Sequence, residues 1–188
     1  MRVTAILWFL LLLAPAMLKA DVLDDLSVRE GMAGQFVQEI VSPDGLIIDQ
    51  SSGSFSLLRP HFLRWEILDP DHQLILADDQ QLTQIDWDLE VVVVRPISEE
   101  ARSPLNWLLA SRSELESAFD VVSAETTAVL VPTDPDAPYG RLEMSRLSPS
   151  DWRLDAVDRA GQTLRVTLSE NGDAPPRQAD FVVPETSF

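Results

Sequence analysis

The chain has 188 residues, a formal net charge of −17 at pH 7 and no cysteine. This length is enough for one domain with a hydrophobic core, and the missing cysteines exclude both a disulfide framework and a lipid attached to an N-terminal cysteine. The strong negative charge argues against nucleic acid as a partner, because phosphate binding requires clustered lysine and arginine side chains.

The first twenty residues have the layout of a secretory signal peptide. Arg2 precedes an apolar run from Val3 to Leu13, and a small residue, Ala20, stands at the expected cleavage position. This apolar run is too short to span a bilayer, which requires about 20 apolar residues. We therefore expect residues 1–20 to be cleaved and residues 21–188 to form a single exported domain without stable membrane insertion. Its acidic surface would repel anionic membranes, or it serves only to keep the protein soluble.

Alternation of apolar and polar residues, which is typical of half-buried strands, dominates the rest of the chain. A short amphipathic helix is predicted at 22–29, and Gly31 and Gly34 are expected to end it. Residues 91–94 read as a strand that is buried on both faces or covered. The other predicted strands, in meander order, are 36–41, 46–50, 53–58, 62–68, 73–77, 82–89, 121–122, 128–131, 141–144, 152–156, 164–168 and 181–183.

The pattern changes near residue 103, where two short helices are predicted within the run of strands. Ser103 is a suitable N-cap, since proline follows it at the first helical position. Leu105 and Leu108 give this first helix an apolar side. Ser113 and Glu116 form a possible capping box for the second helix. We expect these helices to lie over one face of the sheet.

Arg59 and Pro60 separate two of the predicted strands. Proline lacks the N–H that a central strand needs, so Arg59 is expected at a strand end, where its side chain can reach over the rim of the apolar face. Its five donors then require carbonyl or carboxylate partners elsewhere in the chain. The alternative interpretation is a surface ion pair, or an arginine that extends its charge into solvent.

The residue patterns of catalytic and metal sites are missing from the sequence. The two histidines, His61 and His72, stand in no recognisable motif or ligand spacing, and no nucleophile elbow or glycine-rich phosphate loop occurs. The pair Asp78-Asp79 is equally well explained as a solvated turn. We therefore expect a protein that is not an enzyme and uses no metal and no cofactor.

A curved antiparallel sheet whose apolar face is closed by apolar helices makes a cavity suited to hydrocarbon. The predicted fold class is therefore mainly β with short helices, with an antiparallel sheet closed by a helical lid. These side chains could instead pack only against one another as an ordinary core. The predicted lining residues are Leu63, Trp65, Ile67, Leu74, Leu76, Trp87 and Leu89 from the sheet, with Leu105 and Leu108 from the lid.

Several segments together resemble the outer-membrane lipoprotein carrier protein LolA family. They are S-x-G-S-F-x-L-x-R-P at Ser51–Pro60, R-W-E at Arg64–Glu66, the turn at Pro70, Asp78, and S-P-L at Ser103–Leu105. The resemblance extends from Phe36 to about Val183, and the segment that joins the R-P pair to the tryptophan is its most specific part.

The resemblance implies the particular form of this fold, an incomplete antiparallel β-barrel (half-barrel) closed by an α-helical lid, and a location in the periplasm of a Gram-negative bacterium. Its task would be to take lipoproteins released by the inner-membrane Lol ABC transporter, to hold their acyl chains, and to deliver them as a monomer to the outer-membrane receptor LolB. Arg59 matches the arginine that hydrogen-bonds the lid backbone and keeps the cavity closed in the family. Trp65 matches a cavity-facing tryptophan, while Leu105 and Leu108 fall in the lid.

Some positions depart from the family pattern. Leu63 stands where an aromatic residue is usual, Asp79 stands where glycine is usual, and the C-terminus stops early; these changes bear on ligand shape and membrane retention rather than on the class. Two other functions stay open: a LolA-like protein that binds another lipid or amphiphile, and a periplasmic lipid-sensing regulatory domain, which would need a second domain. LolB shares the fold, but the missing lipid-accepting cysteine argues against it.

Overall fold

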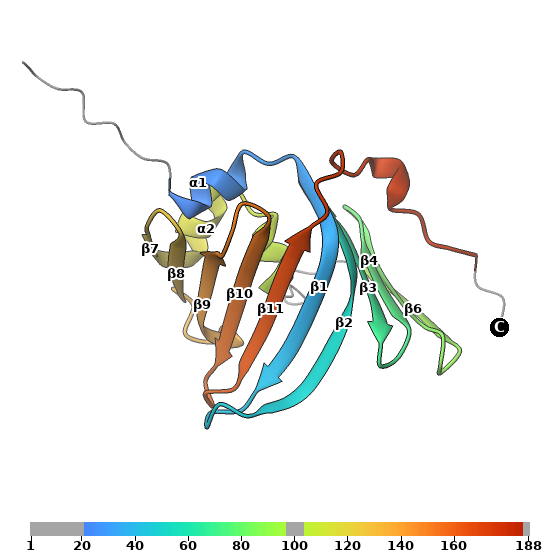
Figure 1. Cartoon of the computed structure of the whole chain (residues 1–188), viewed down its shortest axis with the longest axis horizontal. Coiled ribbons are helices and arrows are strands. Elements are labelled where there is room, and N and C mark those ends of the chain that lie inside the picture. The colour runs from blue at the N-terminus through green and yellow to red at the C-terminus, as the bar shows by residue number, and fades with distance from the viewer. Residues whose placement is uncertain (1–20, 97–103, 186–188) are drawn as a thin grey trace, which may run out of the picture.

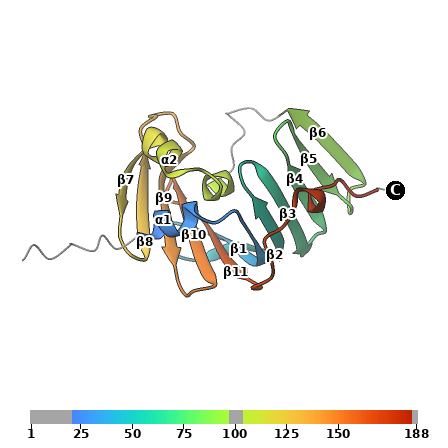
Figure 2. The ribbon, with the colours of Figure 1, turned by 90° about the horizontal axis from the view of Figure 1, so that it is seen from above.

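The computed structural model describes residues 21–96 and 104–185, and its main feature is one antiparallel sheet of 11 strands in the order β6-β5-β4-β3-β2-β1-β11-β10-β9-β8-β7. The sheet curls around three short helices without closing (Figures 1 and 2). The predicted half-barrel is thereby confirmed. The strands are β1 (Gly31–Val41), β2 (Ile47–Leu58), β3 (Phe62–Asp69), β4 (Gln73–Ala77), β5 (Gln81–Asp86), β6 (Val91–Pro96), β7 (Phe119–Ser123), β8 (Thr127–Pro132), β9 (Tyr139–Arg146), β10 (Asp151–Asp158) and β11 (Thr163–Glu170).

Two meanders make up the sheet, and they meet where the first strand pairs with the last. β1 pairs with β11 from Gly34 opposite Glu170 to Val41 opposite Thr163. One meander then runs outward from β1 to β6, and the other runs from β11 to β7. As a result, β6 and β7 are consecutive strands along the chain but lie at opposite edges of the sheet, on the two sides of the view in Figure 2.

The helices lie inside the curve of the sheet (Figure 2). They are α1 (Val22–Ser27), η2 (Pro104–Leu108, a 3-10 helix) and α2 (Arg112–Ala118); we call η2 and α2 the lid. Asp21 caps α1 by accepting hydrogen bonds from the backbone N–H groups of Leu23 and Asp24. Arg112 at the start of α2 pairs with Asp21 and Asp24, with contacts of 2.9 and 2.7 Å, and so joins the lid to α1.

Apolar side chains gather on both faces of the sheet. The larger cluster fills the concave face under α1 and the lid, and it includes Phe36, Phe55 and Trp65. A second cluster lies on the opposite, convex face of β4 and β5, where Phe181 from the C-terminal segment covers it. The convex cluster consists of Leu74, Leu76, Ile85 and Phe181, with Leu58, Phe62 and Trp87 packed against it.

Two glycines lie inside longer strands: Gly34, which was expected to end the first helix, and Gly53, which was expected to begin a strand. Gly34 is part of β1, and Gly53 joins the predicted strands 46–50 and 53–58 into the single strand β2. A Cβ atom on Gly34 would lie 2.0 Å from the carbonyl oxygen of Ser169, and one on Gly53 would lie 1.9 Å from that of Glu66. The glycines therefore permit a close approach of neighbouring strands rather than breaking them. Gly31, the other glycine expected to end the helix, begins β1.

Three other sequence-based predictions are wrong. Residues 91–94 form an exposed edge strand, because β5 pairs with only one side of β6. Residues 181–183 form no strand; they follow the 3-10 helix η3 (Gln178–Asp180), and Phe181 is buried by packing rather than by strand pairing. The capping box of α2 uses Ser111 and Glu114, two residues earlier than predicted, which turns Leu115 into the core. The predicted N-cap Ser103 lies outside the described residues.

Candidate functional site

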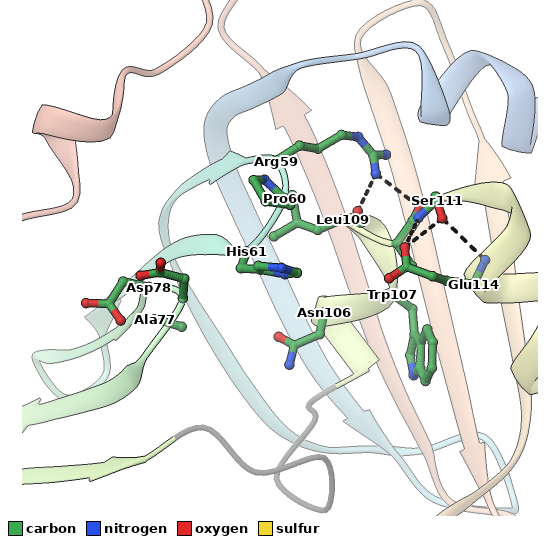
Figure 3. A pocket seen from close by; sticks show the side chains of 12 residues that line it. Arg59, Pro60, His61, Ala77, Asp78, Asn106, Trp107, Leu109, Ser111 and Glu114 are labelled. Atoms are coloured by element: carbon green, nitrogen blue, oxygen red, sulfur yellow. Dashed lines mark hydrogen bonds between the residues drawn. The ribbon is translucent and has the colours of Figure 1, made fainter.

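Arg59 lies where β2 turns into β3, at the rim of the concave face (Figure 3). All of its guanidinium nitrogens donate to backbone carbonyl oxygens of the helices that cover that face. Two acceptors belong to the end of α1 and the residues after it, and three belong to the end of η2. The bonds run from Nε to Arg29 (2.9 Å), from Nη2 to Leu26 (3.0 Å) and Leu108 (3.3 Å), and from Nη1 to Ala110 (3.0 Å) and Leu109.

These acceptors explain why an arginine suits this position. The last carbonyls of a helix have no partner within the helix, and the helix dipole places partial negative charge on them. One planar cation with five donors can satisfy the ends of two helices together, which a lysine could not do. Burial lowers the pKa of Arg59, while the nearby carboxylate of Glu114 raises it. An arginine stays protonated throughout the physiological range even so.

A cavity of about 380 Å³ opens beside this arginine, between the lid and the turns that join β2 to β3 and β4 to β5 (Figure 3). Its size lies at the lower end of the range for small-molecule pockets. Its lining exposes more apolar than polar surface, with Trp107 and Leu109 on one side and the carboxylates of Asp78, Asp79 and Glu114 at the rim. The lining residues are Arg59, Pro60, His61, Ala77, Asp78, Asp79, Asn106, Trp107, Leu109, Ala110, Ser111 and Glu114.

Some of the predicted lining residues come together under the lid. Leu63, Trp65, Leu105 and Leu108 are buried in the concave cluster, and Ile67 packs against it. The ring of Trp65 stacks on Phe36, with 3.7 Å between ring centroids, and a tilted contact of 6.2 Å joins it to Phe55. Trp65 is only 1% exposed, so in this closed state the space around it is filled by protein side chains.

Other predicted lining residues do not reach the concave face. Leu74, Leu76 and Trp87 belong to the convex cluster, and Leu89 is 71% exposed beyond the end of β5. The strand register explains the difference, because the cross-strand partner of Trp65 is Ile75, and not Leu74 or Leu76. Side chains of paired residues point to the same face of a sheet. Placing Leu74 and Leu76 in the cavity was therefore wrong by one residue of register.

The register also identifies residues that the sequence-based prediction missed. Ile75 and Ala77 share the concave face with Trp65 and Leu63. Continuing outward, Gln84 lies opposite Ile75, and Val93 lies opposite Gln84. Ile75 is half-buried and Val93 is 45% exposed, so the concave face becomes progressively more open from β3 towards β6. These residues could have been found from the sequence by starting at Trp65 and assigning its cross-strand partner in each following strand, since paired residues share a face of the sheet.

Within residues 21–96 and 104–185, no three His, Asp or Glu side chains are arranged to hold a metal ion. No helix in the same part of the chain is both long and apolar enough to cross a membrane. The titratable side chains of Glu114 and His61 line the rim of the cavity, and the Ser111 hydroxyl beside them donates to Glu114, its partner in the capping box of α2. The chemistry that this rim offers is hydrogen bonding and charge beside an apolar interior.

Comparison with known proteins places these features in a family. A family model described as outer membrane lipoprotein carrier protein LolA matches residues 27–183. The outer-membrane lipoprotein carrier protein of Bordetella pertussis is 31% identical over 163 residues, which cover 83% of this chain and 78% of the relative. That of Alkalilimnicola ehrlichii is 30% identical over 159 residues, which cover 82% and 74%.

Among solved structures, a LolA superfamily protein from Nitrosomonas europaea matches 83% of this chain and 91% of its own length, with 12% identity and a TM-score of 0.46. The family match itself rests on sequence and spans the sheet, the lid and Arg59. The chain therefore belongs to the outer membrane lipoprotein carrier protein LolA family.

Proposed function

We propose that this protein is a periplasmic carrier of lipoproteins that takes up their acyl chains after release by the inner-membrane Lol ABC transporter and hands them to the outer-membrane receptor LolB. Family membership and relatives that are named outer-membrane lipoprotein carrier proteins support this function. The family is one of carriers rather than enzymes. In this proposal residues 1–20 are a cleaved signal peptide, and residues 21–188 act as a single-domain monomer.

The observation that carries the proposal is the graded opening of the concave face. Its β7–β10 side is filled by buried side chains under α1 and the lid. Towards β6 the face carries half-buried Ile67 and Ile75, then Leu82 with the polar Gln84 and Asp86 on β5, and finally the exposed Val91 and Val93. We place the acyl chains there, between the lid and β3–β6, with the cavity beside Arg59 as their entrance. Each buried methylene contributes about 0.8 kcal/mol, so this surface is a strong alternative to water for hydrocarbon.

Arg59 acts in this proposal as a latch on the lid. Its bonds to the carbonyls of Leu108, Leu109 and Ala110 stabilise the closed state, in which Trp65 and the lid leucines pack against one another. A ligand that occupies the same space has to displace these contacts, and their free energy is subtracted from its affinity. Release to an acceptor with a more favourable site then requires no nucleotide.

The test is a release assay with spheroplasts that carry newly made lipoproteins. The protein without residues 1–20 is added, and the soluble fraction is searched for triacylated lipoproteins in complex with it. Recovery of such complexes, followed by their transfer to LolB, is the expected result. If no lipoprotein is released but an organic extract of the purified protein contains another lipid, the protein carries a different amphiphile and the cargo assignment is wrong.

A further inference from the structure

The edge strand β6 lacks, over its first four residues, the features that normally prevent a sheet edge from pairing with another chain; only its last two residues, Arg95 and Pro96, supply a charge and a proline. Natural edges are blunted by charges, prolines or bulges, because their free backbone groups otherwise attract a further strand. Val91–Val94 contains none of these, and its four side chains are 41–56% exposed. In the part of the chain that the structure describes, no strand pairs with the outer side of β6.

The other edge of the sheet is different. β7 is one residue shorter than β6, and the charged side chain of Asp120 lies near its middle. The residue that follows β7, Ala124, accepts a backbone hydrogen bond from Val22 at the start of α1. The two edges of the same sheet therefore contrast, because a charge and a neighbouring helix protect β7, whereas β6 presents four consecutive exposed valines before Arg95 and Pro96.

The open edge is also close to the entrance of the proposed acyl site. Ala77 of β4 lines the cavity beside Arg59. It pairs with Leu82 of β5, which in turn pairs with Arg95 of β6. Neighbouring strands are about 4.8 Å apart, so a position outside β6 at this level lies about 14 Å from Ala77. An extended peptide covers this distance with about four or five residues.

The direction of the strand favours such a path. β6 runs from Val91 towards Arg95 and Pro96, and this second end is the one at the level of the entrance. A peptide that leaves the entrance and turns along the edge therefore runs opposite to β6. Antiparallel pairing is the slightly more stable arrangement and the more common one.

We propose that β6 binds the extended peptide segment that follows the acylated end of the cargo, as an added antiparallel strand. This inference rests on the proposed carrier function and adds a second binding surface to it. Backbone pairing accepts many sequences, as a carrier of different lipoproteins requires. Carboxylates lie near both ends of the edge, with Asp78 and Asp79 on the entrance side and Asp88 and Glu90 before Val91, and they outnumber the one cation of β6, Arg95. The favoured segment is therefore neutral or basic.

The test uses synthetic ligands with a triacylated N-terminal cysteine and a tail of twelve residues that alternates Val and Ser and ends in Lys. One ligand is unmodified. Two others carry N-methyl groups in the pairing part of the tail, one on three even-numbered and the other on three odd-numbered residues, so that each loses the donors of one side of the strand. A triacylated cysteine without a tail is the matched control for the acyl site. Affinity is measured by displacement of a fluorescent fatty acid, and amide hydrogen exchange is followed by NMR.

We expect one of the two methylated ligands to bind about tenfold more weakly than the unmodified ligand, because only one side of the tail faces β6. Amides of Val91–Val94 should exchange more slowly with the unmodified tail and not with the tail-free control, while those of β7 should not change. If both methylated ligands bind as well as the unmodified one, or β6 gains no protection, the edge does not bind the tail. If the tail-free control also fails to displace the fatty acid, the carrier function itself is wrong.

Discussion

Replacing Arg59 with leucine tests the latch most directly. The leucine keeps an apolar stem but removes all five donors, so the carbonyls of Leu26, Arg29 and the end of η2 lose their partner in the closed state. No other side-chain hydrogen bond to the Leu108, Leu109 or Ala110 carbonyls is recorded among the described residues. The closed lid should therefore become less stable, while the sheet beneath it is unchanged.

The magnitude follows from the bonds and their cost. Five hydrogen bonds at about 1 kcal/mol each set an upper bound near 5 kcal/mol, since such contributions already include the exchange with water. Burial of the guanidinium, which lowers the pKa of Arg59, offsets part of this sum. A net loss of about 2 kcal/mol from the closed state remains, and it corresponds to an increase in ligand affinity of about 30-fold if only the open state binds.

The assay is displacement of a fluorescent fatty acid from the wild-type protein and from Arg59→Leu. The matched control is Arg165→Leu, which removes an arginine of similar exposure that pairs with Asp155 away from the lid. We expect tighter binding and slower transfer to LolB for Arg59→Leu, with no change for Arg165→Leu. An Arg59→Leu protein that is less stable but binds the fatty acid and transfers lipoprotein like the wild type would refute the latch.

Three further predictions concern the packing and the lid contacts. Trp65→Ala removes the ring stacked on Phe36 and should lower the free energy of unfolding by about 3–5 kcal/mol in urea titrations; a loss below about 1 kcal/mol would contradict the packing described. Phe181→Ala should lower it by about 2 kcal/mol and leave fatty-acid affinity unchanged, because the side chain covers only the convex cluster; a weaker affinity would contradict the separation of the two faces. Burial raises the pKa of Asp21, but hydrogen bonds from Ser123 and Arg112 more than offset this and hold it below its ordinary value. The resulting stabilisation is present above about pH 4 and is lost as the pH falls through the folded-state pKa, so wild-type stability should fall more steeply below pH 4 than that of Asp21→Asn. Equal slopes in acid denaturation would show that this carboxylate contributes nothing.

Alternation along single strands predicted the concave core where one face alone is apolar. In β3, Leu63 and Trp65 alternate with charged residues, and they lie in the core as expected. β4 reads QLILA and is apolar on both faces, so its sequence holds no information on which face is which. Only the pairing of Ile75 with Trp65 decides it, and pairing between strands is a property of the whole sheet.

Long-range contacts account for the other errors. Phe181 follows a proline-rich stretch and looks like part of a strand, but its burial comes from Phe62 and the convex cluster, with 5.5 Å between the two rings. The position of Arg59 at a strand end was predicted from Pro60, and so was its need for acceptors. That two of these acceptors, Leu26 in α1 and Arg29 just after it, lie some thirty residues away follows from the fold and from no local pattern.

The order of the strands ties the lid mechanically to the sheet. The lid lies between β6 and β7 along the chain, and these two strands form opposite edges of the same curved sheet. Its second end leads without a break into the sheet, because α2 ends at Ala118 and β7 begins at Phe119. A change in the curvature of the sheet at β7 would therefore move the end of the lid. A membrane partner that grips only one edge, far from Arg59, would thereby gain leverage over the release of the cargo.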